Sequence, residues 1–303
     1  MSAWFGRVQT LLRMHLCLIV AFVVAFPVAT NAQTAREYLN TPVNQFSGFI
    51  EVGYSKAQSA ASADLPLPND VTVSRLTVPY LLYSFPFRKK YAGVSVTTPF
   101  VRVKGPDGSE STGFSDPGFG FHMNLFGLPA ATKEEIGKLV PQNLMSIHVN
   151  VNPPLGSYDR NRAVNMGGNR WTLNPVVNLN ITPDKGVQWF EVYAAGKFFS
   201  DNDHFRGDKR LSQKPLLILT GHYSHNIGKK TWASIGTNYD YGGESSIDNV
   251  PQNNKANGFR PIVAISRLFG RIRINVRYEN TATKETDHKR NGSVTVRFSS
   301  LLF

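Results

Sequence analysis

Apolar and polar side chains alternate along most of this chain, and this alternation limits the folds that it can adopt. The stretch GRIRINVRYEN puts Arg273 and Arg277 on one parity, whereas Ile274, Val276 and Tyr278 lie on the other. Successive side chains of a β-strand point to opposite faces, so such a strand is cationic on one face and apolar on the other.

Twelve segments carry this alternation, and no shift in composition between them marks a second domain. Most have 10 to 15 residues, longer than the roughly five or six of soluble sheets and long enough for tilted strands that cross a bilayer. The predicted strands are 46–55, 71–85, 91–103, 113–126, 143–152, 171–182, 187–200, 215–227, 231–241, 258–269, 271–281 and 292–303.

The connections between these segments alternate in length. PFRKK, PDKG and GKK are short, whereas KAQSAASADLPLPND and DNDHFRGDKRLSQK are long. Short turns on one rim and long loops on the other are typical of bacterial outer-membrane barrels, in which the long loops lie outside the cell. The stretch GLPAATKEEIGKLVP departs from this scheme, and its TKEEIGKL predicts a small capped helix on the short-turn rim.

Residues 1–32 read as a secretory signal that is cleaved after Ala32. Two arginines precede the apolar run LCLIVAFVVAF, and ATNA supplies the small residues of a cleavage site. The apolar run is well short of the roughly 20 residues of a membrane-spanning helix. Cys17, the single cysteine, would leave with the signal. We therefore expect residues 33–303 to form one exported domain without disulfides.

The charge of the mature chain predicts anionic partners. It keeps 31 of the 33 Lys and Arg side chains against 21 Asp and Glu. Because the basic residues are spread along alternating strands of an exported chain, we expect a small solute or the phosphates of lipopolysaccharide rather than nucleic acid. Outer-membrane lipids would surround the barrel.

The fold expected from these features is an all-β, antiparallel up-and-down transmembrane barrel of 12 strands. A soluble β-sandwich would show the same alternation, but strand length, loop asymmetry and the export signal favour the barrel. In a membrane barrel the apolar parity faces lipid and the polar parity faces the lumen. The side chains predicted to line the lumen are Glu51, Arg75, His122, Asn124, His148, Glu191, Lys197, His222, Asp240, Arg273, Arg277, Glu279 and Arg297.

Three of these, Arg273, Arg277 and Arg297, belong to adjacent predicted strands. Their guanidinium groups could form a cationic strip that attracts a carboxylate or phosphate and sets the selectivity of a pore. Alternatively, they pair with the lumen glutamates and only stabilise the wall. The sequence leaves both possibilities open.

The chain ends on Phe303, and an aromatic C-terminal residue is the signal that the barrel-assembly machinery reads in many outer-membrane barrels. Phe298 lies on the opposite parity from Phe303. Either a bulge near Ser299 and Ser300 brings both side chains to one face, or the C-terminal signal is weak.

Two stretches resemble a known family. GFSDPGFGFHMNLFG and NPPLGSYDRNRAVNMGGNRWTLNPVVNLNI are similar to motifs of the outer-membrane transporters named for a meta-pathway of phenol degradation. The resemblance implies a twelve-stranded outer-membrane channel for small, often aromatic, molecules. In the first motif, Asp116 and Pro117 are expected to fix the entry of a strand. In the second, residues 153–159 are expected to turn back over the mouth.

A lipid hydrolase of the outer membrane is the alternative from another functional class. GHYSHN places His222 and Ser224 two residues apart on one strand face, and it resembles the H-x-S of outer-membrane phospholipases. The Asn-Gly that follows in those enzymes is absent, and the lumen parity keeps both side chains from lipid. We therefore expect no catalytic activity.

Cofactor and metal sites are not expected either. His222 and His225 fall on opposite faces of their strand, and the glycines of GGESS are not followed by the Lys of a phosphate-binding loop. A surface-binding or purely structural barrel, with the long loops as its binding surface, stays open. The reading that we favour is a passive outer-membrane channel for small anionic, aromatic or hydrophobic solutes, with 152–170 and 200–214 gating its outer mouth.

Overall fold

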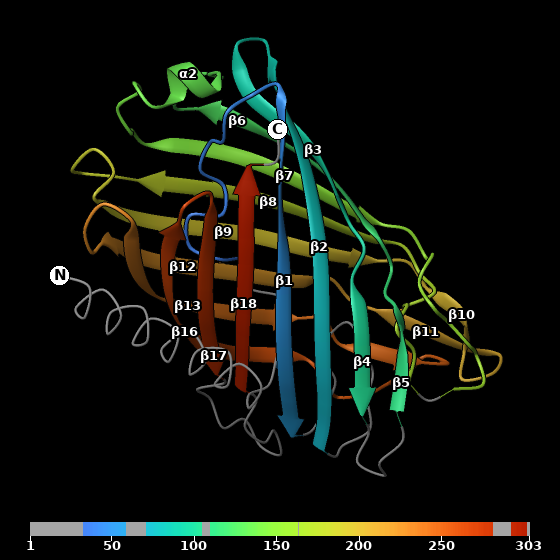
Figure 1. The fold of residues 1–303 in the computed structure, drawn as a ribbon. Coiled ribbons are helices and arrows are strands. Elements are labelled where there is room, and N and C mark those ends of the chain that lie inside the picture. The colour runs from blue at the N-terminus through green and yellow to red at the C-terminus, as the bar shows by residue number, and fades with distance from the viewer. Residues whose placement is uncertain (1–32, 59–70, 105–109, 163, 281–291, 302–303) are drawn as a thin grey trace, which may run out of the picture.

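A computed structural model describes residues 33–58, 71–104, 110–162, 164–280 and 292–301. Twelve antiparallel strands follow one another around a closed barrel, and β1 completes it by pairing with both β2 and β18. This confirms the predicted fold class (Figure 1). The barrel strands are β1 (Gln45–Gln58), β2 (Val71–Phe87), β3 (Lys90–Thr97), β6 (Gly118–Phe126), β7 (Leu144–Asn152), β8 (Thr172–Ile181), β9 (Gln188–Phe199), β12 (Leu216–Asn226), β13 (Thr231–Gly242), β16 (Ala256–Phe269), β17 (Ile272–Asn280) and β18 (Gly292–Leu301).

Two of the predicted strands are interrupted. The segment predicted as 91–103 divides into β3 and β4 (Phe100–Lys104), and the segment predicted as 113–126 divides into β5 (Glu110–Phe114) and β6. Pro99 lies in the first break and Pro117 in the second. Proline has no N–H to donate to a ladder, so strand pairing is weakened where each one stands. The β4–β5 hairpin remains attached to the barrel because β4 pairs with β2.

A second, smaller sheet lies within the long loops, where the sequence predicted none. It consists of β10 (Asn202–Phe205), β11 (Lys209–Gln213), β14 (Ser245–Ile247) and β15 (Val250–Pro251). β11 pairs with β14, and this joins two loops that are distant in the sequence. These strands are too short to show a periodic pattern, so single-sequence periodicity could not reveal them.

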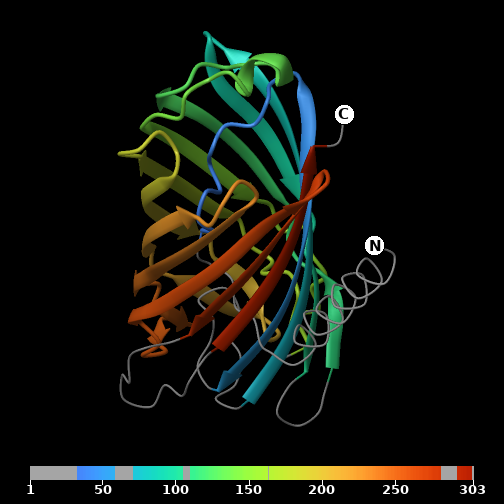
Figure 2. The same cartoon turned by 60° about the vertical axis from the view of Figure 1, so that its left-hand side comes forward.

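The two rims differ as the loop lengths predicted. Figures 1 and 2 show α2 and the short turns at one end of the barrel and the long connections at the other. α2 (Lys133–Ile136) confirms the predicted small helix, and Thr132 and Glu135 form its capping box. The tight turn from β16 to β17 contains Gly270, whose φ of 56° is a left-handed conformation that glycine adopts without steric cost.

The distribution of side chains is that of a membrane barrel. Ile235, Val192 and Val263 are large apolar residues exposed on the outer face. On the opposite parity, polar side chains such as Asn178 and Asn238 are fully buried. Apolar groups face outward and polar groups inward, as lipid on one side and a polar lumen on the other require.

The last strand pairs without a bulge near Ser299 and Ser300, which was one of the two alternatives that the sequence left open. Its register with β1 and with β17 passes through Ser299 and Ser300 unshifted. Phe303 lies outside the described residues, as does the predicted signal, 1–32. In the part of the chain that the structure describes, no helix is long and apolar enough to span a membrane.

The outward face of β13 provides a test of the barrel. We expect Ile235→Arg, near the middle of this strand, to lower the free energy of unfolding by about 2–4 kcal/mol, because the change places a charge in lipid. Val250→Arg, equally exposed but in the small loop sheet, should change it little. Urea unfolding in lipid vesicles, followed by tryptophan fluorescence, measures both. Equal effects would contradict the assignment of faces.

Candidate lumen site

The residues that precede β1 lie inside the barrel, which the sequence did not predict. At the short-turn rim, the Val43 amide donates to the Ala131 carbonyl at 2.9 Å. Further along, the Tyr38 ring lies against that of His148, with 3.5 Å between ring centroids. The Arg36 amide donates to the Glu191 carboxylate at 2.7 Å on the far wall. Residues 33–44, called the lumen segment below, therefore cross from the β1–β3 side of the barrel to the β9–β12 side.

One anchor of the lumen segment is an ion-pair cluster. Arg297, with 14% of its side chain exposed, lies 3.2 Å from Glu37 of the segment and 2.8 Å from Glu51 of β1. Its guanidinium also lies over the Phe49 ring, 4.0 Å from the centroid. Removing charges from water is costly unless they are paired, so this cluster stabilises the lumen only while both carboxylates are in place.

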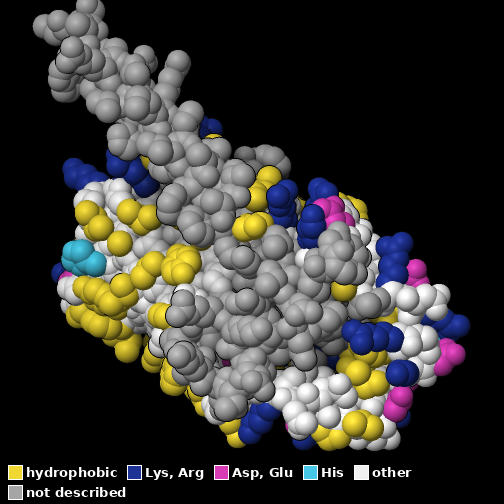
Figure 3. Space-filling view, turned by 90° about the horizontal axis from the view of Figure 1, so that it is seen from below, with side chains coloured by type: hydrophobic (Ala, Val, Ile, Leu, Met, Phe, Trp, Pro, Cys, Tyr) yellow, Lys and Arg dark blue, Asp and Glu magenta, His cyan; other side chains and the backbone are white. Residues whose placement is uncertain are grey.

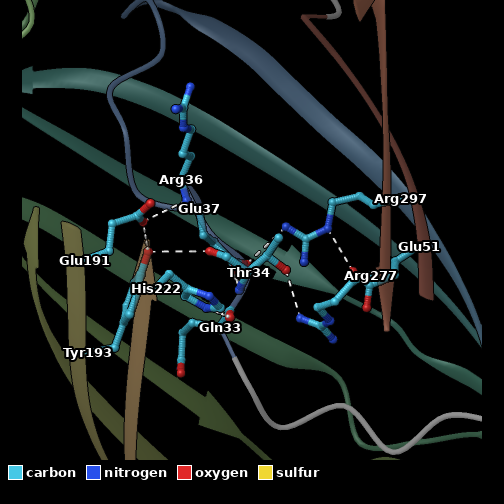
Figure 4. A network of polar contacts seen from close by, with 10 residues as sticks. All are labelled: Gln33, Thr34, Arg36, Glu37, Glu51, Glu191, Tyr193, His222, Arg277 and Arg297. Carbon is cyan, nitrogen blue, oxygen red and sulfur yellow. Dashed lines mark hydrogen bonds and ion pairs between the residues drawn. The ribbon is translucent and has the colours of Figure 1, made fainter. Parts of the chain in front are cut away.

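Arg36 forms a second anchor on the opposite wall. Its side chain donates to the Ser224 hydroxyl at 2.9 Å and to the Asn226 side chain at 2.6 Å. The guanidinium also lies 5.2 Å from the centre of the Trp232 ring. Glu191 accepts a hydrogen bond from the Tyr193 hydroxyl in addition to the bond from the Arg36 amide. Figure 4 shows the two hydrogen bonds that Glu191 accepts.

The start of the lumen segment has its own partners. Arg277 donates to the Thr34 hydroxyl at 2.9 Å, and a ring nitrogen of His222 lies 2.8 Å from the Gln33 carbonyl oxygen (Figure 4). Thus the bonds of His222 and Ser224 go to the lumen segment and to Glu191. They do not form the serine–histidine pair that the hydrolase alternative requires.

A further ion-pair cluster lies on β13, β16 and β17. Arg260 is 2.7 Å from Asp240 and 2.9 Å from Glu279. Sequence reasoning missed Arg260, although it alternates with Phe259 and Pro261 and so belongs to the lumen parity of its strand. Glu279 is therefore paired with Arg260 of β16 and not with Arg273 or Arg277 of its own strand.

The structure favours pairing over an uncompensated cationic strip. Arg297 is held by two glutamates, and Arg277 contacts the lumen segment. Arg273 is half-buried and donates to the Ser266 hydroxyl at 3.3 Å. A role of these arginines in selectivity stays a prediction. The other predicted lumen residues on inward-facing parities are Glu51, His122, Asn124, His148, Glu191, Lys197, His222, Asp240 and Glu279.

Arg75 is an exception, because it points away from the lumen. It shares its parity with exposed Leu81 on β2, whereas Tyr80 on the other parity stacks on Phe49 beneath Arg297. Its guanidinium lies 5.9 Å from the centre of the Tyr54 ring on the outer wall. The prediction was wrong because β2 presents apolar side chains on both faces, so alternation did not identify its inner face.

Apolar and aromatic side chains also face the lumen. Val176, Ala195, Leu216 and Ile218 form a buried cluster with Tyr193, and Tyr38 packs against it. Ala195 and Tyr193 share their strand parity with Glu191, and Leu216 and Ile218 share theirs with His222. Both Glu191 and His222 were predicted to face inward, so parity could have identified these side chains. Further round the wall, the His122 and His148 rings stack with 4.8 Å between centroids.

Asp116, which was expected to fix the entry of a strand, holds the loop that follows β7. Its carboxylate accepts hydrogen bonds from the Gly156 amide at 2.8 Å and from the Gly168 amide at 2.7 Å. A Cβ at Gly156 would lie 2.7 Å from the backbone of Asp116, so only glycine allows this approach. The Tyr158 hydroxyl donates to the His204 carbonyl at 2.7 Å, and burial raises the pKa of Tyr158. This loop is thereby tied to both β5–β6 and the small sheet.

Within the described residues, no three or more His, Cys, Asp or Glu side chains are grouped so that they could hold a metal ion. The arrangement is instead a closed wall around a segment of its own chain, held by ion pairs, hydrogen bonds and stacked rings.

Comparisons with known proteins agree with this geometry. The family described as "Putative MetA-pathway of phenol degradation" matches residues 55–285. The structure superposes on the crystal structure of an outer membrane channel from Pseudomonas putida F1 with a TM-score of 0.76 and 19% identity, covering 89% of this chain and 100% of that one. For a NanC porin the TM-score is 0.47 and the identity 11%, over 84% and 100%. No curated protein matches. At 19% identity, the similarity to the Pseudomonas putida channel shows that the two proteins share a fold.

The Glu37–Arg297 ion pair can be tested through the mobility of the lumen segment. Glu37→Gln removes one of the two carboxylates that compensate a buried guanidinium, and we expect amide exchange in residues 34–44 to rise at least roughly tenfold. Glu244→Gln breaks the ion pair with Lys214 in the long loops and serves as the control. Hydrogen–deuterium exchange by mass spectrometry resolves the segment. Unchanged exchange in Glu37→Gln would show that the ion pair does not hold it.

The Asp116 carboxylate provides a separate test. Asp116→Asn replaces one carboxylate oxygen by an amide NH₂ that faces a glycine N–H. We expect this to weaken the attachment of the loop by about 1.5–3 kcal/mol. We expect trypsin to cut after Arg160 or Arg162 roughly tenfold faster. Asp203→Asn, which changes an exposed pair with Arg210, should leave cleavage nearly unchanged. Similar rates in both variants would contradict the proposed anchor.

Proposed function

The chain belongs to the phenol-degradation family whose match is given above, and from that premise we propose that it is a passive bacterial outer-membrane channel for small aromatic or hydrophobic solutes. The observation that carries the proposal is the apolar cluster of Val176, Ala195, Leu216 and Ile218 on the inner wall beside Tyr38 and Tyr193. A barrel that only needed a polar lumen would place no such surface there.

The charges of the lumen support this choice of solute. The guanidinium of Arg297 and that of Arg260 each have two carboxylate partners, so their charges are compensated. A compensated arginine attracts an anionic solute weakly, whereas an apolar surface gains free energy from any apolar molecule that covers it. The anionic alternative rests mainly on half-buried Arg273.

Passage through this barrel requires the lumen segment to move. A solute that enters from the long-loop rim reaches the apolar cluster first and meets Tyr38 there. The segment is held by side-chain contacts and a few backbone hydrogen bonds, and the structure gives it no strand partner. Its displacement therefore leaves the closed barrel intact. The orientation with the long loops outside, and removal of 1–32, are parts of the same proposal.

The apolar cluster can be tested by solute flux. We expect Ile218→Asn to reduce the flux of a phenol-type tracer into vesicles roughly tenfold, because a hydrophobic contact on the path becomes polar. Ile262→Asn is the matched control, since this isoleucine is equally buried on the lumen parity of β16 but lies outside the cluster. A hydrophilic anion should cross both variants at similar rates.

Single-channel conductance under a salt gradient separates the alternatives. Discrete anion-selective steps that disappear in a variant with Arg273, Arg277 and Arg297 changed to Gln would favour the anionic solute. Electrical silence together with absent tracer flux, from protein shown to be folded, would contradict a channel. That result would favour the surface-binding barrel.

A further inference from the structure

Two rows of side chains cross the outer wall near the long-loop rim. In the row nearer the loops, Tyr54 of β1 lies opposite Arg75 of β2, Arg75 opposite Arg102 of β4, and Arg102 opposite Thr112 of β5. Lys104 follows Arg102 on the same parity. The outer wall therefore carries two arginines and a lysine close together, which we call the basic row.

The basic row is not electrically balanced by the described residues around it. Arg102 and Lys104 share one carboxylate, Glu110, and side chains of the three are 51%, 56% and 39% exposed. Arg75 lies over a tyrosine ring, which attracts a cation but carries no charge. Like charges directly opposite on neighbouring strands are unfavourable. Arg75 and Arg102 are such a pair, so an anion bound between them would relieve their repulsion.

An apolar row lies one step further from the loops on the same outer face. Val52 is opposite Thr77, Thr77 opposite Phe100, and Phe100 opposite Phe114. The Phe100 and Phe114 rings meet edge to face with centroids 5.2 Å apart, and Phe114 is 57% exposed. The basic row thus lies between the long loops and a surface suited to hydrocarbon chains.

We propose that this surface binds a phosphate of the lipid A part of lipopolysaccharide, with its acyl chains on the apolar row. Arginine is suited to phosphate because its planar guanidinium donates two parallel hydrogen bonds. The proposal rests on the orientation given under Proposed function, in which the long loops face the lipopolysaccharide leaflet. Figure 3, seen from below the view of Figure 1, shows Lys and Arg around the edge of this face with Asp and Glu interspersed among them.

The opposite rim lacks this arrangement among the described residues. There Arg267 lies over Phe269 and Arg88 over Phe87, each cation with its own ring, and neither arginine is paired across strands with another. A lone cation above an aromatic ring is common wherever a barrel wall meets water. Directly opposed arginines that share too few carboxylates are the distinguishing feature of the basic row.

The test compares lipopolysaccharide binding by three variants of the full folded protein. A variant with Arg75→Gln, Arg102→Gln and Lys104→Gln should bind lipopolysaccharide in phosphatidylcholine vesicles at least roughly tenfold more weakly. Each cation near an anionic lipid contributes about fivefold to the affinity, and screening by salt reduces this contribution. Glu110→Gln removes the one acid and should strengthen binding. Arg267→Gln with Arg271→Gln, on exposed arginines of the other rim, should match the unmodified protein.

Lipid chemistry identifies the ligand. Lipopolysaccharide stripped of its lipid A phosphates should bind the unmodified protein as weakly as intact lipopolysaccharide binds the triple variant. Equal binding of phosphatidylglycerol would show a general attraction to anionic lipid and would overturn the proposal. So would unchanged affinity in both the triple variant and Glu110→Gln.

The same preparations separate this proposal from the channel. Heat-modified gel migration confirms that each variant is folded, and tracer flux should be the same in all of them, because the basic row lies outside the lumen. If tracer flux is observed but the triple variant binds lipopolysaccharide as the unmodified protein does, the lipid site is refuted and the channel is retained. If lipopolysaccharide binds specifically but no tracer flux is observed, the channel is refuted and the lipid site is retained.

Discussion

The ladder that joins β1 to β18 is the interaction on which the rest of the structure depends. A sheet in lipid must satisfy every backbone N–H and C=O internally, and an open edge would leave a row of them unpaired. Pairing of β1 with both β2 and β18 removes that edge. Once the barrel is closed, each strand has one face toward lipid and one toward the lumen, and this decides where every side chain of the wall lies.

Closure creates a second constraint, because the enclosed polar groups need partners. A barrel of this size has little room for water, and the lumen segment supplies many of the missing contacts from within the chain. Its Glu37 compensates Arg297, and its Arg36 contacts the wall around Glu191. The same segment brings Tyr38 against apolar residues of β8, β9 and β12. Ion pairs thus hold the segment beside the surface that we assign to solute.

The proposed channel and the proposed lipid site lie on opposite faces of one wall. Alternation makes them independent, since a substitution on the outer parity of β2 or β4 does not enter the lumen. Asp116 stands in the break between β5 and β6 and holds the loop after β7. The position of this loop therefore depends on one carboxylate.

The sequence by itself determined the closed barrel, its strand order, the asymmetry of its rims and the inward face of most side chains that it placed in the lumen, because a period of two is a local property that each strand displays alone. Arg75 was misplaced since β2 is apolar on both faces, and local alternation is then uninformative. Only the tertiary structure decided that residues 33–44 lie in the lumen, that Arg260 pairs with Glu279, and that Arg75 opposes Arg102. Those contacts join residues far apart in the chain, and their register and reach are set by closure of the barrel and not by any nearby sequence pattern.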